Sequence, residues 1–181
     1  SRINDFSKPL RIMHFGDSQL EGDRISGVIR ENLQTLFGGC GVGFIPISET
    51  NTGRLSVLKE ENGWERYQVF GNGRKGNHSR YGFMGYYYKV GKDTAKQKTA
   101  EIEIRQNRRY FRKAQNFEQI SLLYANSPEK VEYELKTDTG IVSKGNLLAS
   151  KDVKRRIWQM NGFSTGKISL FLETVNSPDF Y

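Results

Sequence analysis

The triplet Gly16-Asp17-Ser18 places a hydroxyl group directly after an apolar segment and before a helical pattern. A serine at the end of a strand in an α/β sheet lies where ligands bind and beside helix N-terminal amides that stabilise an oxyanion. Gly16 permits a tight turn, and Asp17 can hold that turn by accepting nearby backbone amides. The triplet alone is compatible with a nucleophile at Ser18, but a helix N-cap is the commoner role of a serine in such a triplet.

A serine is a poor nucleophile without a general base, and the sequence has two histidines, His14 and His78. His14 stands one residue before the end of the apolar segment, where we expect it to support the serine turn by hydrogen bonding. His78 lies in the polar stretch "GNGRKGNHSRYGFMG", which predicts a loop. A pairing of Ser18 with His78 stays open, because catalytic triads are defined by geometry and not by chain order.

Two elements must position Ser18: an apolar strand from Leu10 to Phe15 and a helix from Asp23 to Phe37. In the helix, apolar residues recur at offsets of three and four, which predicts one apolar face. Gly38 and Gly39 are expected to end it. We expect burial of four residues on this face: Ile25, Val28, Ile29 and Leu33.

From about Asn51 onward the apolar pattern changes to the period of strands. The stretches are "AEIEIRQ", "EQISLLYAN", "KVEYELKTD", "GIVSKGNLL", "RRIWQM" and "KISLFLETV", and "KTDTG" predicts a hairpin turn between two of them. Regular strands without intervening helices are typical of an antiparallel sandwich. The predicted fold class is α+β: a strand-turn-helix over residues 1–50, and a mostly antiparallel, jelly-roll-like β-sandwich over residues 51–181.

Composition excludes several classes of site. Nine Tyr, eleven Phe and nineteen Gly favour β-structure with tight turns. The single cysteine, Cys40, cannot form an internal disulfide, and two histidines are too few for a structural zinc cluster. No apolar run approaches the roughly 18 residues of a membrane helix. We therefore expect no metal, no cofactor and no transmembrane segment.

The formal net charge of +8 suits an anionic partner. The basic residues gather in Arg105 to Lys113 ("RQNRRYFRK") and Lys151 to Arg156 ("KDVKRR"), which are interleaved with strand and turn patterns. We interpret both runs as solvated faces of the sandwich, open to a polyanion, and not as a nucleic-acid footprint. A basic nucleic-acid binder is therefore the last-ranked function.

The block "IMHFGDSQLEGDRISGVIRENLQTLFGGCGVGFIP" resembles the first block of the SGNH, or GDSL-type, hydrolases. The resemblance is to the bacterial envelope branch, with its pattern His-x-Gly-Asp-Ser-Gln/His, a following Gly-Asp-Arg, and a glycine-rich GxGF segment. It covers Ile12 to Pro46. In that branch a β-sandwich similar to a carbohydrate-binding module is inserted after the first block, as in peptidoglycan O-acetylesterases, and residues 51–181 look similar in kind.

By this resemblance Ser18 is the nucleophile and its backbone amide is part of the oxyanion hole, while Asp17 and Gly16 support the turn. The implied activity is an O-acetylesterase acting on peptidoglycan or another polysaccharide of the periplasm or cell envelope. The family also needs an Asp-x-x-His, but Arg11 stands three residues before His14 and Lys75 three before His78. We therefore expect the catalytic base, and the remainder of the hydrolase domain, elsewhere in a parent protein, and no esterase activity from this chain alone.

Four further residues are candidates for binding substrate. Asp23 and Arg24 either orient the loop above Ser18 or bind polar groups of the substrate; a helix N-cap Asp beside a solvent-exposed Arg is the equal alternative. Tyr86 and Tyr88 belong to the run Tyr86-Tyr87-Tyr88, whose alternate faces in a strand offer rings either to sugars or to the core. The alternative to the esterase is a non-catalytic sandwich that binds or scaffolds carbohydrate.

Overall fold

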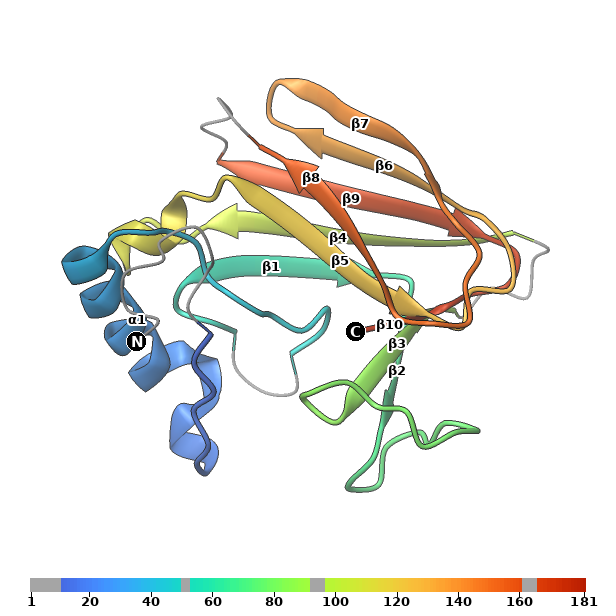
Figure 1. The fold of residues 1–181 in the computed structure, drawn as a ribbon, viewed down its shortest axis with the longest axis horizontal. Coiled ribbons are helices and arrows are strands. Elements are labelled where there is room, and N and C mark those ends of the chain that lie inside the picture. The colour runs from blue at the N-terminus through green and yellow to red at the C-terminus, as the bar shows by residue number, and fades with distance from the viewer. Residues whose placement is uncertain (1–10, 50–52, 92–96, 161–165) are drawn as a thin grey trace, which may run out of the picture.

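The computed structural model describes residues 11–49, 53–91, 97–160 and 166–181, and these are mostly antiparallel β-structure with one α-helix (Figure 1). The helical elements are the 3-10 segment η2 (Ser18–Asp23), helix α1 (Arg24–Phe37) and the 3-10 segment η3 (Arg112–Gln115). The strands are β1 (Val57–Asn62), β2 (Trp64–Gln68), β3 (Tyr86–Val90), β4 (Lys98–Gln106), β5 (Gln119–Ala125), β6 (Val131–Thr137), β7 (Gly140–Leu147), β8 (Lys154–Gln159), β9 (Lys167–Thr174) and β10 (Asp179–Phe180).

The strands form two five-stranded sheets that face each other as a sandwich. One sheet has the order β1-β4-β9-β6-β7 and the other β2-β3-β10-β5-β8, and every paired neighbour is antiparallel. The six strands predicted from the sequence are β4 to β9, and the hairpin predicted at "KTDTG" joins β6 to β7 with Thr137 opposite Gly140. The predicted antiparallel sandwich is confirmed at this level.

Two strands, β1 and β10, have no clear signal in the sequence. β1 is an edge strand with a largely polar sequence and one buried residue, Val57. β10 has only two residues, and it closes the second sheet by pairing with both β3 and β5. Such strands exist because their neighbours supply hydrogen-bond partners, which a local pattern does not reveal.

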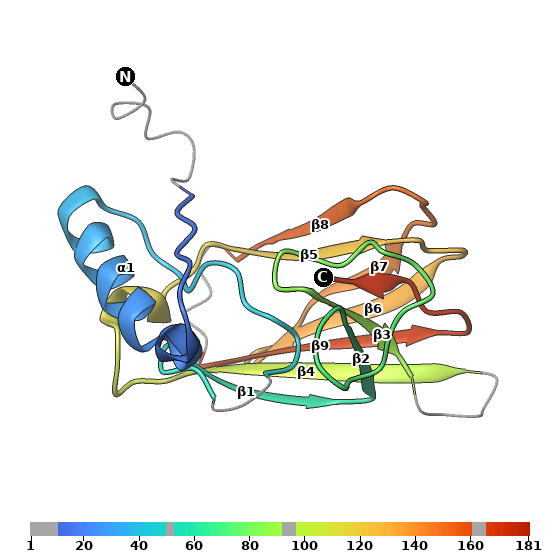
Figure 2. The same cartoon turned by 90° about the horizontal axis from the view of Figure 1, so that it is seen from below.

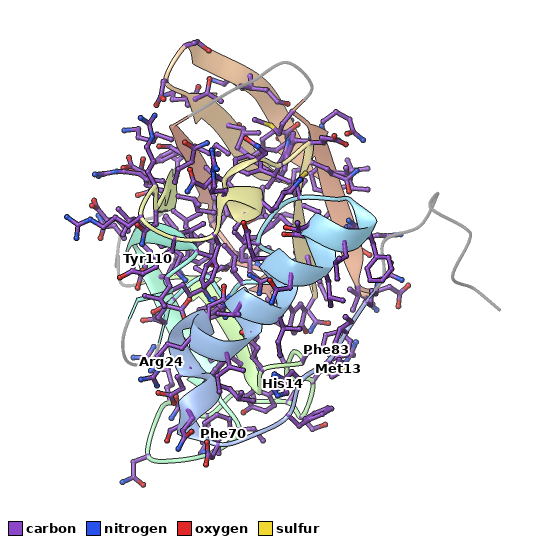
Figure 3. All side chains as sticks on the ribbon, turned by 90° about the vertical axis from the view of Figure 1, so that its left-hand side faces the viewer. Met13, His14, Arg24, Phe70, Phe83 and Tyr110 are labelled. Atoms are coloured by element: carbon purple, nitrogen blue, oxygen red, sulfur yellow. The ribbon has the colours of Figure 1, made fainter. Side chains whose placement is uncertain are left out.

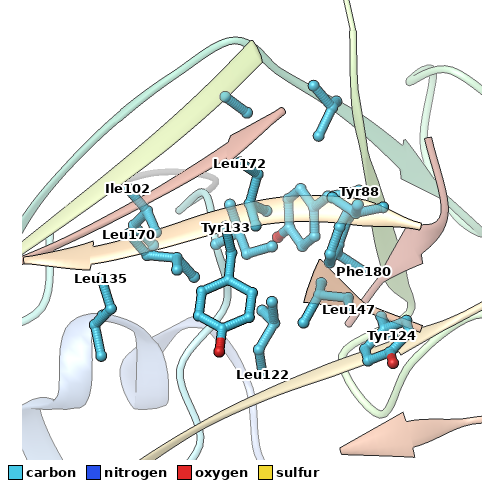
Figure 4. Packing of buried hydrophobic residues seen from close by; sticks show 14 of the residues in the cluster. Tyr88, Ile102, Leu122, Tyr124, Tyr133, Leu135, Leu147, Leu170, Leu172 and Phe180 are labelled. Carbon is cyan, nitrogen blue, oxygen red and sulfur yellow. The ribbon is translucent and has the colours of Figure 1, made fainter. Parts of the chain in front are cut away.

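The core lies between the two sheets and follows the two-residue period of the strands (Figure 4). In β6, Val131, Tyr133 and Leu135 point inward, and the residues between them are exposed or half-buried. The second sheet contributes large rings, among them Tyr124 and Phe180. Burial of these apolar side chains is the main stabilisation of the sandwich.

Helix α1 is confirmed and ends at Phe37, followed by Gly38 with a φ of +83°. The burial predicted for its apolar face is wrong: Ile25 is 40% exposed, Val28 50% and Ile29 42%, and Leu33 is half-buried. Helical periodicity orients these side chains to one side, but no described element covers that side. The face therefore remains open to solvent.

The strand predicted from Leu10 to Phe15 is also wrong over its described part. Residues 11–16 have no regular secondary structure, and Phe15 is 80% exposed. Leu10 lies outside the described residues. An isolated extended segment becomes a strand only when a neighbour pairs with it, and in the described parts of the chain none does.

The N-terminal block packs against one end of the sandwich, with α1 beside η3 (Figures 1 and 2). The ring of Phe111 lies against Gly27, where an added Cβ would approach it to 2.4 Å. The backbone amide of Lys113 donates to Glu31. Ile47 belongs to the sandwich core, so the chain links the two parts before residue 50. The division into domains at 50/51 stays a prediction.

None of the described helices has the length and apolarity to cross a membrane.

Candidate functional site

Ser18 is the first residue of η2 and is exposed. The carboxylate of Asp17 accepts the backbone amide of Gln19 at 2.9 Å, and Asp17 is the N-cap of this segment, so Ser18 is not a helix N-cap. Gly16 lies so close to Leu20 that a Cβ would meet its side chain at 2.5 Å. The turn is therefore locally built, with an accessible hydroxyl.

Asp23 and Arg24 brace this turn through hydrogen bonds. The Asp23 carboxylate is buried and accepts two hydrogen bonds of 2.8 Å from Arg30 and one of 2.6 Å from Ser26. Burial acts to raise the pKa of Asp23, but the hydrogen bonds, first from Arg30 and then from Ser26, outweigh it and lower that pKa. Arg24 donates to the carbonyl oxygens of Ser18 and Glu21 at 3.0 and 3.1 Å.

These contacts show how Asp23 and Arg24, the two residues near Ser18 that were predicted to bind substrate, are engaged within the chain. The buried carboxylate of Asp23 is engaged by Arg30, whereas the guanidinium of Arg24 orients the backbone of the Ser18 turn. Asp23 is the N-cap residue of α1 in left-handed conformation, with a φ of +67°, and its side chain makes no cap hydrogen bond. Binding of substrate by either residue stays a prediction.

No histidine is arranged as a base for Ser18 in the described parts of the chain. His78 donates from Nε2 to Asp179 at 2.8 Å, and its Nδ1 accepts the backbone amide of Arg80 at 3.2 Å, so both ring nitrogens are engaged. His14 is exposed and makes no hydrogen bond to the Ser18 turn among the described residues. The sequence-based hypothesis that Ser18 pairs with His78 therefore has no support in the geometry.

The tyrosine run forms β3, and both of its faces are covered. Tyr88 is buried between the sheets and donates to the carbonyl of Ser48 at 3.0 Å. Tyr87 is fully buried on the outer face, where burial and the nearby Asp179 raise its pKa to about 12. Tyr86 is half-buried, with Arg66 over its ring. Ligand binding by Tyr86 and Tyr88 stays a prediction, and Tyr88 offers no exposed surface.

A polar network fastens the segment after β2 onto the outer face of the second sheet. The buried carboxylate of Asp179 accepts from His78 and from Asn126, and it forms an ion pair with Lys89 at 3.4 Å. The His78 ring stacks on Tyr87, with their centroids 4.8 Å apart. Charged and hydrogen-bonded groups of this kind fix loop geometry, because an unpaired buried carboxylate is costly.

Next to this network lies an aromatic surface formed by Tyr67, Glu65 and Arg74, here called the Tyr67 surface. The half-buried Tyr67 ring stacks parallel on Tyr87, with centroids 4.8 Å apart and an interplanar angle of 1°. The Tyr67 hydroxyl donates to Glu65 at 3.1 Å. Arg74 lies over the ring, 5.6 Å from its centroid, and pairs with Glu65. The ring is thus held rigidly below an exposed guanidinium.

The sequence reasoning missed this surface. Its only local signal is the alternation in "WERYQ", which places Glu65 and Tyr67 on the same face of β2, opposite the buried Trp64. Arg74 comes from a loop and reaches the ring only through the fold. Among the described residues no group of His, Cys, Asp and Glu side chains is arranged to hold a metal ion.

No family model and no curated protein matches the chain. Among solved structures, 70% of the chain aligns with 18% of the enzymatically active domain of tailspike protein 4 from bacteriophage CBA120, with a TM-score of 0.41 and 9% identity. Similarly, 69% of the chain aligns with 93% of the family 32 CBM of C. perfringens NanJ, solved with galactose, with a TM-score of 0.35 and 9% identity. The resemblance to SGNH hydrolases stays a prediction, and the sandwich is established by the chain's own strand registers.

Proposed function

We propose that the chain is a polysaccharide-binding β-sandwich that holds a sugar ring against the Tyr67 surface. The observation that carries this proposal is the fixed Tyr67 ring with the exposed Arg74 above it and the carboxylate of Glu65 beside it. The C–H groups on one side of a pyranose ring are apolar and slightly positive, and they suit the negative face of an aromatic ring.

The polar groups around Tyr67 suit the hydroxyl groups of a sugar. The Arg74 side chain is 56% exposed, so a ligand can displace it from the ring or accept its hydrogen bonds. Burial acts to raise the pKa of Glu65, but hydrogen bonds from Arg74 and Tyr67 outweigh it and lower that pKa. The side chain of Glu65 therefore stays an ionised carboxylate, which accepts hydrogen bonds. Once Arg74 moves off the ring, Tyr67 offers an aromatic platform that its stacking on Tyr87 holds in place, with a donor and an acceptor beside it.

Affinity electrophoresis tests this proposal with gels that contain neutral soluble glycans, among them acetylated xylan and glycol chitin. We expect the 181-residue chain to be retarded in at least one gel, and Tyr67→Ala to weaken that binding by about tenfold, which corresponds to about 1.4 kcal/mol.

The matched control is Tyr67→Phe, which keeps the stacked ring and loses only the hydroxyl. It should retain most of the binding. The proposal is wrong if no glycan retards the chain, or if a folded Tyr67→Ala variant binds as well as the unchanged chain.

A second candidate is the SGNH-type O-acetylesterase, with Ser18 as nucleophile. It is favoured by exposed apolar side chains on both sides of the serine turn, in the segment from Ile12 to Phe15 and on the open face of α1. Figure 3 shows Met13 and His14 near this helix. A helix and a lone extended segment of this kind normally pack against further strands of an α/β sheet. In this proposal those strands and the catalytic base belong to other parts of a parent protein.

A further inference from the structure

Residues 107–116, in the connection between β4 and β5, carry an unusual density of exposed cations and are here called the arginine loop. Arg108, Arg109 and Arg112 are all exposed, and Tyr110 between them is 43% exposed. Among the residues that the structure describes, none of these three guanidinium groups forms an ion pair with a carboxylate.

The neighbouring Arg105 behaves differently, although it belongs to the same basic run of the sequence. It pairs with Glu60 at 2.9 Å and with Glu103 at 2.5 Å, so its charge is balanced within the first sheet. The fold therefore divides the basic run into two parts. Arg105, at the end of β4, is paired with carboxylates, whereas the arginines of the loop are not.

The backbone of the arginine loop is braced by side-chain hydrogen bonds. The side-chain oxygen of Asn107 accepts a hydrogen bond from the backbone amide of Arg109 at 3.3 Å. Gln115 donates to the carbonyl oxygens of Asn107 and Tyr110 at 3.2 and 3.0 Å. Phe111, with a φ of +45°, anchors the loop against Gly27 of α1. The three arginines therefore project from a backbone of defined shape, which lowers the entropic cost of binding an anion.

We propose that the arginine loop binds the carboxylate groups of an acidic polysaccharide. A guanidinium group matches a carboxylate with two parallel hydrogen bonds, and three arginines within five residues can contact successive charged groups of one polymer. Tyr110 supplies an exposed ring for the apolar side of a sugar. Single-stranded nucleic acid is the less suitable anion, because its binding surfaces stack successive bases on several rings and this loop exposes one.

This site is separate from the Tyr67 surface and does not depend on it. The arginine loop lies with η3 beside α1, whereas β2 lies away from α1, at the lower right of Figure 1. Tyr110 also lies on the opposite side of α1 from Met13 and Phe83 in Figure 3. Binding of a charged polymer and stacking of a neutral sugar can therefore be measured independently.

The test uses the 181-residue chain and immobilised polygalacturonate, with methyl-esterified polygalacturonate as the uncharged polymer. The triple variant R108Q/R109Q/R112Q should bind polygalacturonate at least about tenfold more weakly, because charge-assisted hydrogen bonds are lost. The unchanged chain should lose at least about tenfold in affinity between about 20 mM and about 200 mM salt, and it should bind the esterified polymer weakly.

The matched control is K151Q/K154Q/R155Q, which removes the same charge from exposed cations at β8 and the residues before it. It should bind nearly as well as the unchanged chain. Equal loss in both triple variants would show that only net charge matters and would overturn the proposal. So would absence of polygalacturonate binding at low salt, or tighter binding of a single-stranded oligonucleotide that is lost in R108Q/R109Q/R112Q. Failure of the Tyr67→Ala test would leave these outcomes unchanged.

Discussion

At the scale of single residues, Asp23 is the best-defined charge near the serine turn. Its carboxylate is buried, whereas Arg30 is partly exposed, and the two form a bidentate pair between the start of α1 and its second turn. Asp23 also stands at a positive φ, which an L-residue adopts only with support from its surroundings. The pair therefore fixes how η2, and with it Ser18, enters α1.

We expect Asp23→Asn to lower the free energy of unfolding by about 2–3 kcal/mol, because the change removes one partner of a largely buried pair. Urea denaturation measures this, with Arg30→Gln and the double variant completing a cycle. The coupling between the two sites should be about 1 kcal/mol or more. Additive effects would show that the two side chains do not act as a pair.

The lowered pKa of Asp23 also gives this contribution a pH dependence. It is fully present above the ordinary Asp pKa of about 4, and it is lost as the pH falls through the lower pKa of the folded state. The stability difference between the unchanged chain and Asp23→Asn should therefore shrink only in acid, below about pH 4.

At the scale of elements, the contact between α1 and the arginine loop depends on a glycine inside a helix. A glycine there costs up to about 1 kcal/mol relative to alanine, but at Gly27 the missing Cβ leaves room for the Phe111 ring. Packing has therefore overridden helix propensity at this position.

We expect Gly27→Ala to destabilise the chain by about 1–2 kcal/mol in spite of the better helix propensity of alanine, because the ring must move. In a Phe111→Ala background the same substitution should be neutral or stabilising. Thermal or urea unfolding of the four proteins distinguishes the cases. If Gly27→Ala is stabilising in both backgrounds, the ring is not what requires the glycine.

At the scale of the whole molecule, catalysis by Ser18 needs a general base, and the described residues bring none to its hydroxyl. Ser18 has an exposed, braced turn, but both nitrogens of His78 are engaged elsewhere and His14 is not bonded to the turn. The second candidate function places the missing groups in a further structure that would cover the open face of α1.

We therefore expect the 181-residue chain to hydrolyse p-nitrophenyl acetate no faster than buffer. If the second candidate function is right, a full-length parent protein should hydrolyse it, and Ser18→Ala should reduce that rate by about 10⁴-fold or more, the loss known for serine triads. Turnover by the short chain that His78→Ala abolishes would contradict the absence of a base. Activity of the parent that survives Ser18→Ala would reject Ser18 as the nucleophile.

Features that depend on local periodicity and turn chemistry could be predicted from the amino-acid sequence. The two-residue alternation predicted β4 to β9, the offsets of three and four predicted α1, and Gly38 marked its end. These predictions succeed because each element's side-chain pattern is imposed by its own backbone geometry. The serine turn was recognisable for the same reason, since its contacts span only a few residues.

The faces that are covered and the distant residues that meet became visible only in the three-dimensional fold. One face of α1 is apolar by sequence but exposed. Burial requires a neighbouring element, and the periodicity of a helix does not show whether such a neighbour is present. Asp179 reaches His78 across 101 positions of the chain, and Arg74 reaches Tyr67 from a loop. The basic run from Arg105 to Lys113 was visible in the sequence, but only the positions of Glu60 and Glu103 determine that Arg105 is neutralised while the arginines of the loop keep their charge unbalanced.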